Sequence, residues 1–204
     1  MHALIVVAHP DSNSLTHNLA HQVAEGLKAV GHSAELADLH AEGFDQRYSL
    51  ADLNVHRHMA TPPADVLAEQ ARIERADSLV LVFPVYWWSL PGLLKSWVER
   101  VFSNGWAFGY SLEGGLQKKL RHLQVHLIGV AAGDAGLFQR HGYDQAMKTQ
   151  IDHGIFDYCG VSVRGSHLMF ESESRDPTPH LEAARSIGQA MFATVPAQQT
   201  AEVV

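Results

Sequence analysis

Two kinds of hydrophobic pattern alternate along this chain. Short, continuous apolar runs rich in β-branched residues are typical of parallel strands that are covered on both faces. Longer stretches in which apolar residues recur every three or four positions are typical of helices with one buried face. The first pattern predicts strands at residues 4–8, 34–39, 78–83, 123–131 and 161–170. The second predicts helices at residues 15–30, 62–75, 90–102, 143–158 and 180–192.

The alternation of strand and helix predicts an α/β fold with an open, five-stranded parallel sheet and helices on both faces. No linker, repeat or low-complexity tract divides the chain, so we expect a single domain over residues 1–194. Residues 195–204 follow the last predicted helix, and we expect them to form a disordered tail. One long irregular stretch, residues 40–61, interrupts the pattern, and such a stretch inside a compact domain is usually functional or a solvated surface loop.

The composition excludes several classes of function. The 204 residues include 15 basic and 22 acidic side chains, and a net charge of −7 argues against binding to nucleic-acid phosphates. The apolar N-terminal run is too short to insert into a membrane and lacks the positive segment of a signal peptide. The single cysteine, Cys159, cannot form an internal disulfide. We therefore expect a cytoplasmic enzyme.

Ligands of an open parallel sheet bind beyond the carboxyl ends of the strands, at the point where the strand order reverses. Three loops are expected to leave those ends, at residues 9–16, 84–89 and 132–142. If the fold prediction holds, these loops are neighbours in space, and the chemistry of the protein belongs there.

The first loop ends where a helix begins. Ser12, Ser14, Thr16 and nearby backbone amides could hold a phosphate at the positive end of that helix. Taken alone, these residues are better explained by a plain N-cap. The glycine pattern GxGxxG of dinucleotide-binding folds is absent from the sequence.

The second loop carries three consecutive aromatic residues, Tyr86, Trp87 and Trp88. A flat conjugated ligand would explain aromatic rings at a ligand-binding edge, and a core cluster or a dimer contact are the alternatives. The third loop contains small residues that let the backbone approach a ring edge. His141 and Tyr143 follow it and could exchange protons with a substrate or bind it, although a surface histidine without a role is an equally good reading.

Other chemistries have weaker support. His17 and His21 are spaced to share a helix face, and His56 and His58 lie close together, but no HExxH motif or third ligand accompanies them, so we expect no metal. A serine hydrolase would need a GxSxG motif, which is absent. Cys159 has apolar neighbours, which favours a buried structural thiol over a nucleophile.

At these positions the chain resembles the NAD(P)H:quinone oxidoreductases of DT-diaphorase type, within the flavodoxin-like superfamily, and their bacterial relatives. The most specific match is the block FPVYWWSLPGLLKSWVERVF, which has the pattern FP-x-x-W-x-x-P-x-x-L-K-x-W-x-[ED]-RV. The remaining matches are 3–9 (ALIVVAH), 68–76 (AEQARIERA), 105–110 (GWAFGY), 140–142 (RHG) and 156–160 (FDYCG).

The resemblance implies a homodimeric flavoprotein that reduces quinones by two electrons in a ping-pong cycle, with NAD(P)H as hydride donor. It implies a catalytic role for His141, near the flavin, and an active site at the dimer interface. Tyr143, which follows the third loop, is the second catalytic candidate. The implied flavin-binding residues are His9, Ser14, Leu15, Thr16, Asn18, Pro84, Val85, Tyr86, Trp87, Trp88, Ala131, Ala132, Gly133 and Asp134. The implied substrate-binding residues are Trp106, Phe108, Tyr110 and Phe138.

Relatives that bind FAD carry extra chain between the second strand and the second helix, and residues 40–61 supply such chain here, so we expect FAD, with FMN as the alternative. The alternative function, which some relatives have, is that of an ancillary subunit that binds a flavin or nucleotide and regulates a membrane transport system, with little turnover. The chain also departs from the family: a loop that often reads Thr-Thr-Gly-Gly is Ala131-Ala132-Gly133-Asp134 here, and Phe108 stands where a tyrosine is common.

Overall fold

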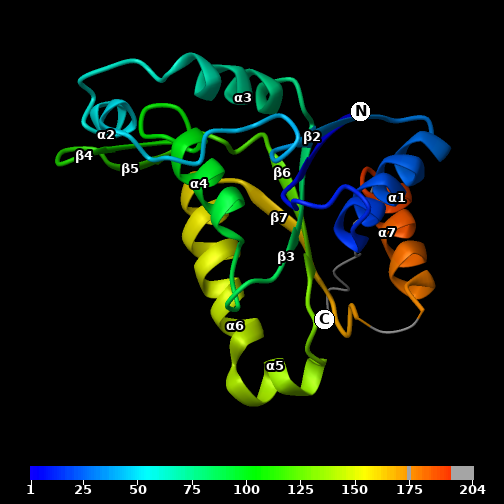
Figure 1. Cartoon of the computed structure of the whole chain (residues 1–204). Coiled ribbons are helices and arrows are strands. Elements are labelled where there is room, and N and C mark those ends of the chain that lie inside the picture. The colour runs from blue at the N-terminus through cyan, green and yellow to red at the C-terminus, as the bar shows by residue number, and fades with distance from the viewer. Residues whose placement is uncertain (174–175, 194–204) are drawn as a thin grey trace, which may run out of the picture.

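Five parallel strands form the central sheet of this protein, which we describe from a computed structural model that covers residues 1–173 and 176–193. The strand order is β2-β1-β3-β6-β7, so the order reverses between β1 and β3 (Figure 1). This confirms the predicted open, five-stranded parallel sheet. The strands are β1 (His2–Val7), β2 (Ser33–Asp38), β3 (Ser78–Pro84), β6 (Gln124–Val130) and β7 (Ser162–Met169).

Helices cover both faces of the sheet (Figure 1). α1 and α7 lie on one face, over a core of small and β-branched side chains from β1, β3 and β6. The larger core, which contains Trp97, Phe138 and Phe156, fills the other face. The helices are α1 (Leu15–Ala29), α2 (Leu50–His56), α3 (Ala64–Glu74), α4 (Gly92–Val101), α5 (Ala135–His141), α6 (Tyr143–Met147) and α7 (Thr178–Ala190), with a π-helix at Lys148–Asp157.

The two helices on the first face touch through glycine. A β-carbon at Gly26 of α1 would lie 2.1 Å from the carbonyl oxygen of Arg185, and one at Gly188 of α7 would lie 2.2 Å from that of Val23. Real β-carbons do not approach backbone atoms that closely, so both positions require glycine. The two helix backbones therefore pack directly against each other.

Several elements differ from the sequence prediction. The stretch 132–142 was expected to be a loop, but its second half forms α5, which caps the carboxyl end of the sheet at the bottom of Figure 1. The helix predicted at 143–158 is present, but from Lys148 onward it is a π-helix. An antiparallel hairpin, β4 (Phe108–Ser111) and β5 (Gly115–Lys118), was not predicted and projects from the body of the molecule (Figure 1).

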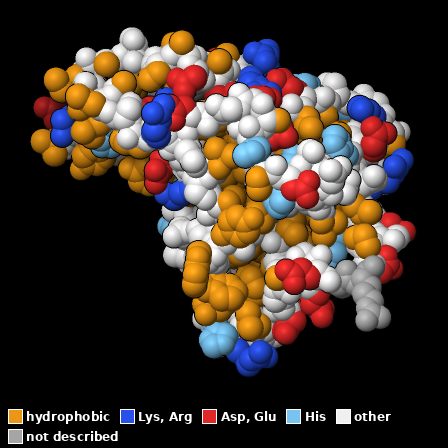
Figure 2. All heavy atoms as spheres, in the orientation of Figure 1, with side chains coloured by type: hydrophobic (Ala, Val, Ile, Leu, Met, Phe, Trp, Pro, Cys, Tyr) orange, Lys and Arg blue, Asp and Glu red, His pale blue; other side chains and the backbone are white. Residues whose placement is uncertain are grey.

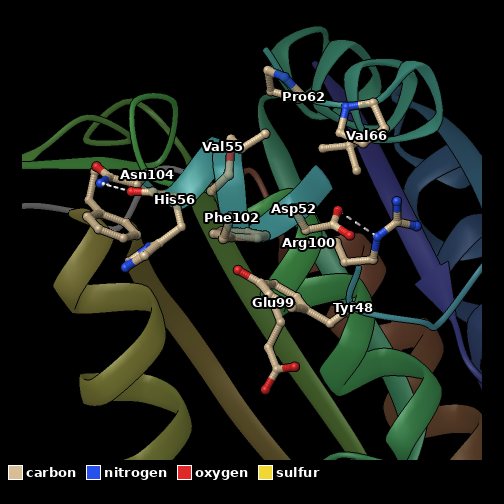
Figure 3. Close-up of a pocket in the computed structure, with 13 residues that line it drawn as sticks. Tyr48, Asp52, Val55, His56, Pro62, Val66, Glu99, Arg100, Phe102 and Asn104 are labelled. Carbon is tan, nitrogen blue, oxygen red and sulfur yellow. Dashed lines mark hydrogen bonds and ion pairs between the residues drawn. The ribbon is translucent and has the colours of Figure 1, made fainter. Parts of the chain in front are cut away.

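The irregular stretch 40–61 is held to the body of the protein by a buried ion pair. Arg100 of α4 donates from Nε to Asp52 at 2.9 Å, and both side chains are at most 5% exposed (Figure 3). The same guanidinium donates to Asp65 of α3 at 2.7 Å and to the carbonyl oxygen of Asp45 at 2.7 Å. One arginine thus joins α2, α3 and α4, and α2 occupies part of a segment that was expected to be irregular.

The predicted disordered tail, residues 195–204, lies outside the described residues. Among the described residues, no helix has the length and apolar character needed to cross a membrane. Cys159 is buried, as predicted, and burial raises the pKa of its thiol to about 11.

Candidate functional site

The three loops that leave the carboxyl ends of β1, β3 and β6 meet at one edge of the sheet. A cavity of about 480 Å³ lies between the first and second loops and includes His9, Pro10 and Tyr86 among its lining residues. A second cavity, of about 190 Å³, lies between the second and third loops, and its lining residues are Val85, Trp87, Trp88, Ala131, Ala132, Gly133 and Phe138. The structure therefore brings together the three segments that the sequence analysis selected.

A strained turn forms the centre of this edge. Tyr86 and Ser89 exchange backbone hydrogen bonds of 3.2 and 3.1 Å around Trp87 and Trp88, whose φ angles are +49° and +61°. Positive φ at both central residues is the signature of a type I′ turn, which normally takes asparagine or glycine. Among the described residues, the N–H groups of Trp87 and Trp88 donate to no protein acceptor. Strain of this kind persists where the surroundings enforce it, and it is concentrated at functional sites.

The two tryptophan side chains have different surroundings. Trp87 is 93% exposed and presents its ring to solvent. Trp88 is half-buried, because its ring stacks on that of Tyr143 with centroids 3.8 Å apart and meets Phe138 edge-on at 5.4 Å. Tyr143 stacks in turn on the exposed ring of His141, with centroids 5.2 Å apart. Both catalytic candidates thus lie in one aromatic stack that begins at the strained turn.

Phe138 contributes differently from the sequence expectation of a substrate-binding residue. Its side chain is 1% exposed and packs among Trp88, Tyr143 and Phe170. It lines the 190 Å³ cavity from the core side. A side chain so deeply buried can shape the cavity, but it offers little surface to a substrate.

The third loop is short because α5 begins at Ala135. Asp134 is the N-cap of this helix, and its carboxylate accepts a hydrogen bond of 2.8 Å from the N–H of Leu137. Ala131 is buried, whereas Ala132 and Gly133 are more accessible. Because their side chains are small or absent, the backbone itself borders the cavity here. The carboxylate that distinguishes this loop from the family pattern therefore has a local structural role.

The first loop presents the N-terminus of α1 to the same edge. Ser14 caps the helix, and its hydroxyl accepts a hydrogen bond from the N–H of His17 at 3.3 Å. Leu15 is half-buried, Thr16 is 2% exposed and Asn18 points to solvent one turn further on. His9 is half-buried and accepts the N–H of Asp11 at 3.0 Å. Of these residues, Ser14 and His9 present side-chain polar groups at the end of the helix.

The sequence did not lead us to predict the two residues that lie behind Ser14, His17 and Asp38. His17 is 3% exposed, and its ring nitrogens lie 3.0 Å from the hydroxyl of Ser14 and 2.8 Å from the carboxylate of Asp38. Burial opposes ionisation of Asp38, but hydrogen bonds from Ala41, His17 and His40 outweigh it and hold the pKa of that carboxyl below its usual value. His17 was considered only as a metal ligand paired with His21. His17 lies three residues after the N-cap serine, and this spacing could have indicated the contact between the two side chains.

Trp106, Phe108 and Tyr110 do not line either of the two cavities at the carboxyl edge. Trp106 donates from its indole nitrogen to Glu74 of α3 at 2.7 Å, and Phe108 meets Tyr158 edge-on at 5.2 Å. Tyr110 is 59% exposed on the hairpin, where further apolar side chains gather (Figure 2). Within one chain, these three residues are separate from the strained turn.

Phe108 instead lines a third cavity, of about 130 Å³, between α2, α3 and α4 (Figure 3). The Asp52–Arg100 ion pair forms part of its wall, and Asn104 donates to the carbonyl oxygen of His56 at 2.9 Å at its rim. No residue from the strands of the central sheet lines this cavity, so it is not a continuation of the carboxyl-edge site.

The residues at the carboxyl edge fit a flavin. An exposed tryptophan face and two free N–H donors suit a flat ring system with polar atoms along one side. The small residues of the third loop leave room for a ring edge, and the capped N-terminus of α1 suits a phosphate. The described residues contain no group of three or more histidine, cysteine, aspartate or glutamate side chains arranged to hold a metal ion.

Comparisons with known proteins agree with this arrangement. Residues 1–190 match the family described as having a flavodoxin-like fold. The ribosyldihydronicotinamide dehydrogenase [quinone] of Pongo abelii is 29% identical over 192 residues, which are 83% of this chain and 81% of that relative.

Two solved structures share the fold. The NAD(P)H:quinone oxidoreductase from Methanothermobacter marburgensis superposes with a TM-score of 0.86 at 24% identity, over 96% of this chain and 98% of that one. An FMN-dependent NADH-azoreductase from Bacillus anthracis, solved in complex with FMN, superposes with a TM-score of 0.68 at 18% identity, over 93% and 96% of the two chains. Because the family match extends over residues 1–190 and the strand order agrees with it, this chain belongs to the family of flavodoxin-like fold.

Proposed function

We propose that this protein is a flavin-dependent NAD(P)H:quinone oxidoreductase that reduces quinones or similar small electrophiles by two electrons. The observation that carries the proposal is the strained Trp87–Trp88 turn, whose two free N–H groups border a cavity at the carboxyl edge of the sheet. The relationship to a dehydrogenase [quinone] at 29% identity supports the same reaction class.

The flavin supplies the hydride chemistry when it is bound, and the chain supplies orientation, exclusion of water and hydrogen bonds. Trp87 offers a flat surface, and the N–H groups of Trp87 and Trp88 are free to donate to the polar side of a ring. His141 lies at the exposed end of the aromatic stack, where it can hold a proton next to developing negative charge. Tyr143 fixes the ring of His141 and carries a hydroxyl at the same edge.

The absorption spectrum of the purified protein is the first test. We expect the visible absorption bands of a bound flavin, their loss on addition of NADH or NADPH under anaerobic conditions, and their return on addition of a quinone. A protein that takes up neither FAD nor FMN and oxidises neither nicotinamide would contradict the proposal.

We further propose that the cofactor is FAD and that FMN is the alternative. In support, the stretch between β2 and α3 adds the residues His40, Gly43, Phe44 and Gln46 to the wall of the 480 Å³ cavity beside His9. This cavity is larger than the 190 Å³ cavity at the strained turn and could hold the adenine half of FAD. Release of the cofactor by heat and measurement of its mass distinguishes FAD from FMN.

We infer that the active protein is a cytoplasmic homodimer, each chain a single domain over residues 1–194, with Trp106, Phe108 and Tyr110 completing the site of the partner. In support, the hairpin that contains Phe108 and Tyr110 exposes Tyr110 at 59% and Leu112 at 95%, an apolar surface that a second copy would cover. Light scattering on the wild type and on the double variant Tyr110→Ser, Leu112→Ser tests this. We expect a dimer that the variant weakens, and a wild-type monomer with full activity would contradict it.

A further inference from the structure

His17 is buried directly beneath the end of α1 that points to the candidate cofactor site. Its Nδ1 lies 3.0 Å from the hydroxyl oxygen of Ser14, and its Nε2 lies 2.8 Å from a carboxylate oxygen of Asp38. The three side chains form one hydrogen-bonded line, from β2 through α1 to the helix cap.

The carboxylate end of this line is chemically fixed. Asp38 accepts hydrogen bonds of 3.1 Å from the backbone N–H groups of both His40 and Ala41, which are donors only. An ionised carboxylate has no hydrogen to give, so Nε2 of His17 must carry the hydrogen that joins it to Asp38. Only the protonation of Nδ1, which faces Ser14, can therefore change.

The protonation of Nδ1 decides what Ser14 can offer to a ligand. If Nδ1 is bare, the Ser14 hydroxyl donates its only hydrogen inward to Nδ1 and turns an oxygen lone pair outward. If Nδ1 is protonated, it donates to the Ser14 oxygen, which also accepts the N–H of His17 at 3.3 Å, and the hydroxyl hydrogen is released to point outward. Only the second arrangement donates to a phosphate oxygen.

Charge acts in the same direction. With a neutral imidazole, the line contains the uncompensated carboxylate of Asp38, which repels an anion at the end of the helix. With an imidazolium, the buried pair is neutral overall. A phosphate that arrives at Ser14 therefore favours the imidazolium both by hydrogen bonding and by charge.

We propose that His17 is a positioning residue that couples binding of the flavin phosphate to uptake of one proton, by turning the Ser14 hydroxyl outward. This inference rests on the proposed flavin-binding function and adds a linkage between cofactor retention and pH. The protein should hold its cofactor less tightly as the pH rises.

Other titratable groups face His17 and must be separated from it. His9 of the first loop meets its ring edge-on with centroids 6.2 Å apart, and Asp11 lies in the same loop. His40 follows β2, and His21 lies one turn further along α1. β3 has no titratable side chain, and the only titratable side chain of β1 is His2, at the opposite end of the strand. On α7, the charge of Arg185 acts on Glu25, which lies near the far end of α1.

The test compares FMN with riboflavin, which lacks only the phosphate, on the full-length chain freed of flavin. Calorimetry between pH 7 and 9 in two buffers of different ionisation enthalpy measures the protons taken up on binding. Because the phosphate of FMN is largely dianionic above pH 7, its own titration contributes little. We expect a net uptake of protons when FMN binds, an FMN affinity that falls about tenfold or more by pH 9, and neither effect with riboflavin.

Equal proton uptake by FMN and riboflavin would overturn this inference and leave the proposed function intact. Failure of FMN, riboflavin and FAD alike to bind would overturn the proposed function and this inference with it. In His17→Gln, whose amide can still donate to Asp38, we expect FMN to bind without proton uptake, while His21→Gln on the same helix behaves as wild type. Uptake that persists in His17→Gln, or that disappears in His9→Gln instead, would also overturn it.

Discussion

Trp88 and Tyr143 stack face to face, with ring centroids 3.8 Å apart and ring planes 8° apart. The contact joins the strained turn after β3 to the start of α6, and His141 continues the stack on the far side of Tyr143. The two catalytic candidates are therefore positioned by a tryptophan that itself has an unfavourable, positive φ. Activity and stability at this edge of the sheet are consequently linked.

The Tyr143 ring should matter for stability and its hydroxyl for turnover. Tyr143→Phe keeps the stack, so we expect an unchanged melting temperature and slower quinone reduction. Tyr143→Leu loses the stack with Trp88 and His141 and should cost about 1 kcal/mol, or a few degrees in melting temperature. Thermal unfolding and steady-state kinetics on both variants check this. Equal activity of Tyr143→Phe and wild type would remove the hydroxyl from the reaction.

His141 is expected to act on the reductive half of the cycle. Its replacement by alanine removes a proton and charge donor at the exposed end of the stack and should slow flavin reduction by NADH about 10- to 1000-fold. Stopped-flow absorbance measures this rate directly. His153→Ala, which changes an exposed histidine on the π-helix, is the matched control and should leave the rate unchanged.

Substitution of Trp87 is expected to stabilise the fold and to weaken binding of the cofactor. Its ring is 93% exposed and its φ is +49°, a conformation that asparagine tolerates better. Trp87→Asn should therefore raise the free energy of unfolding by about 1 kcal/mol while weakening flavin binding roughly tenfold.

Trp88→Asn provides the contrast to that variant, because it relieves a similar φ of +61° but removes a half-buried, stacked ring. We expect it to lower the free energy of unfolding. Denaturant unfolding and flavin titration on both variants decide the matter, and a destabilised Trp87→Asn would show that its turn is not strained.

His126 should make the fold sensitive to acid. Its ring is buried on β6 with neither nitrogen hydrogen-bonded among the described residues, and burial, with the nearby charges of His167 and Arg164, lowers its pKa to about 4. The unfolded chain takes up this proton near pH 6.5 and the folded chain does not, so stability falls as the pH drops from about 7 towards 4. The loss from this group approaches about 3 kcal/mol.

Denaturant unfolding from pH 7.5 to 4.5 tests that prediction. His126→Leu should lose less stability over this range than the wild type, whereas His21→Leu, which changes an exposed histidine, should follow the wild-type curve. Parallel curves for wild type and His126→Leu would contradict it.

The central sheet was predictable because its strands are buried on both faces. β3 consists of seven fully covered residues, and the continuous run SLVLVF shows this directly. The β4–β5 hairpin was missed because its eight residues are half-buried or exposed and show no apolar period. α5 was missed for a related reason: Phe138 is the only buried residue of its seven, too few to reveal a helical repeat.

The convergence of the three loops followed from the fold, but their local chemistry did not. Asp38 reaches His17 because β2 pairs in parallel with β1, which sets Asp38 beside Val7 at the start of the first loop. The spacing of residues along the chain does not reveal which residues of β1 and β2 pair, so this contact could not be predicted. The type I′ turn was hidden for a different reason, since Trp87 and Trp88 are residues that such turns normally avoid.

The close approach of α1 and α7 at Gly26 and Gly188 has a consequence for cofactor retention. α1 has Ser14 at one end and lies directly against the backbone of α7 near the other. A helix is stiff along its axis, so a tilt imposed at Gly26 moves the N-terminus as well. A bulky side chain at Gly188, or a ligand that pushes α7 aside, would therefore act as a lever and release a phosphate that no residue of α7 touches.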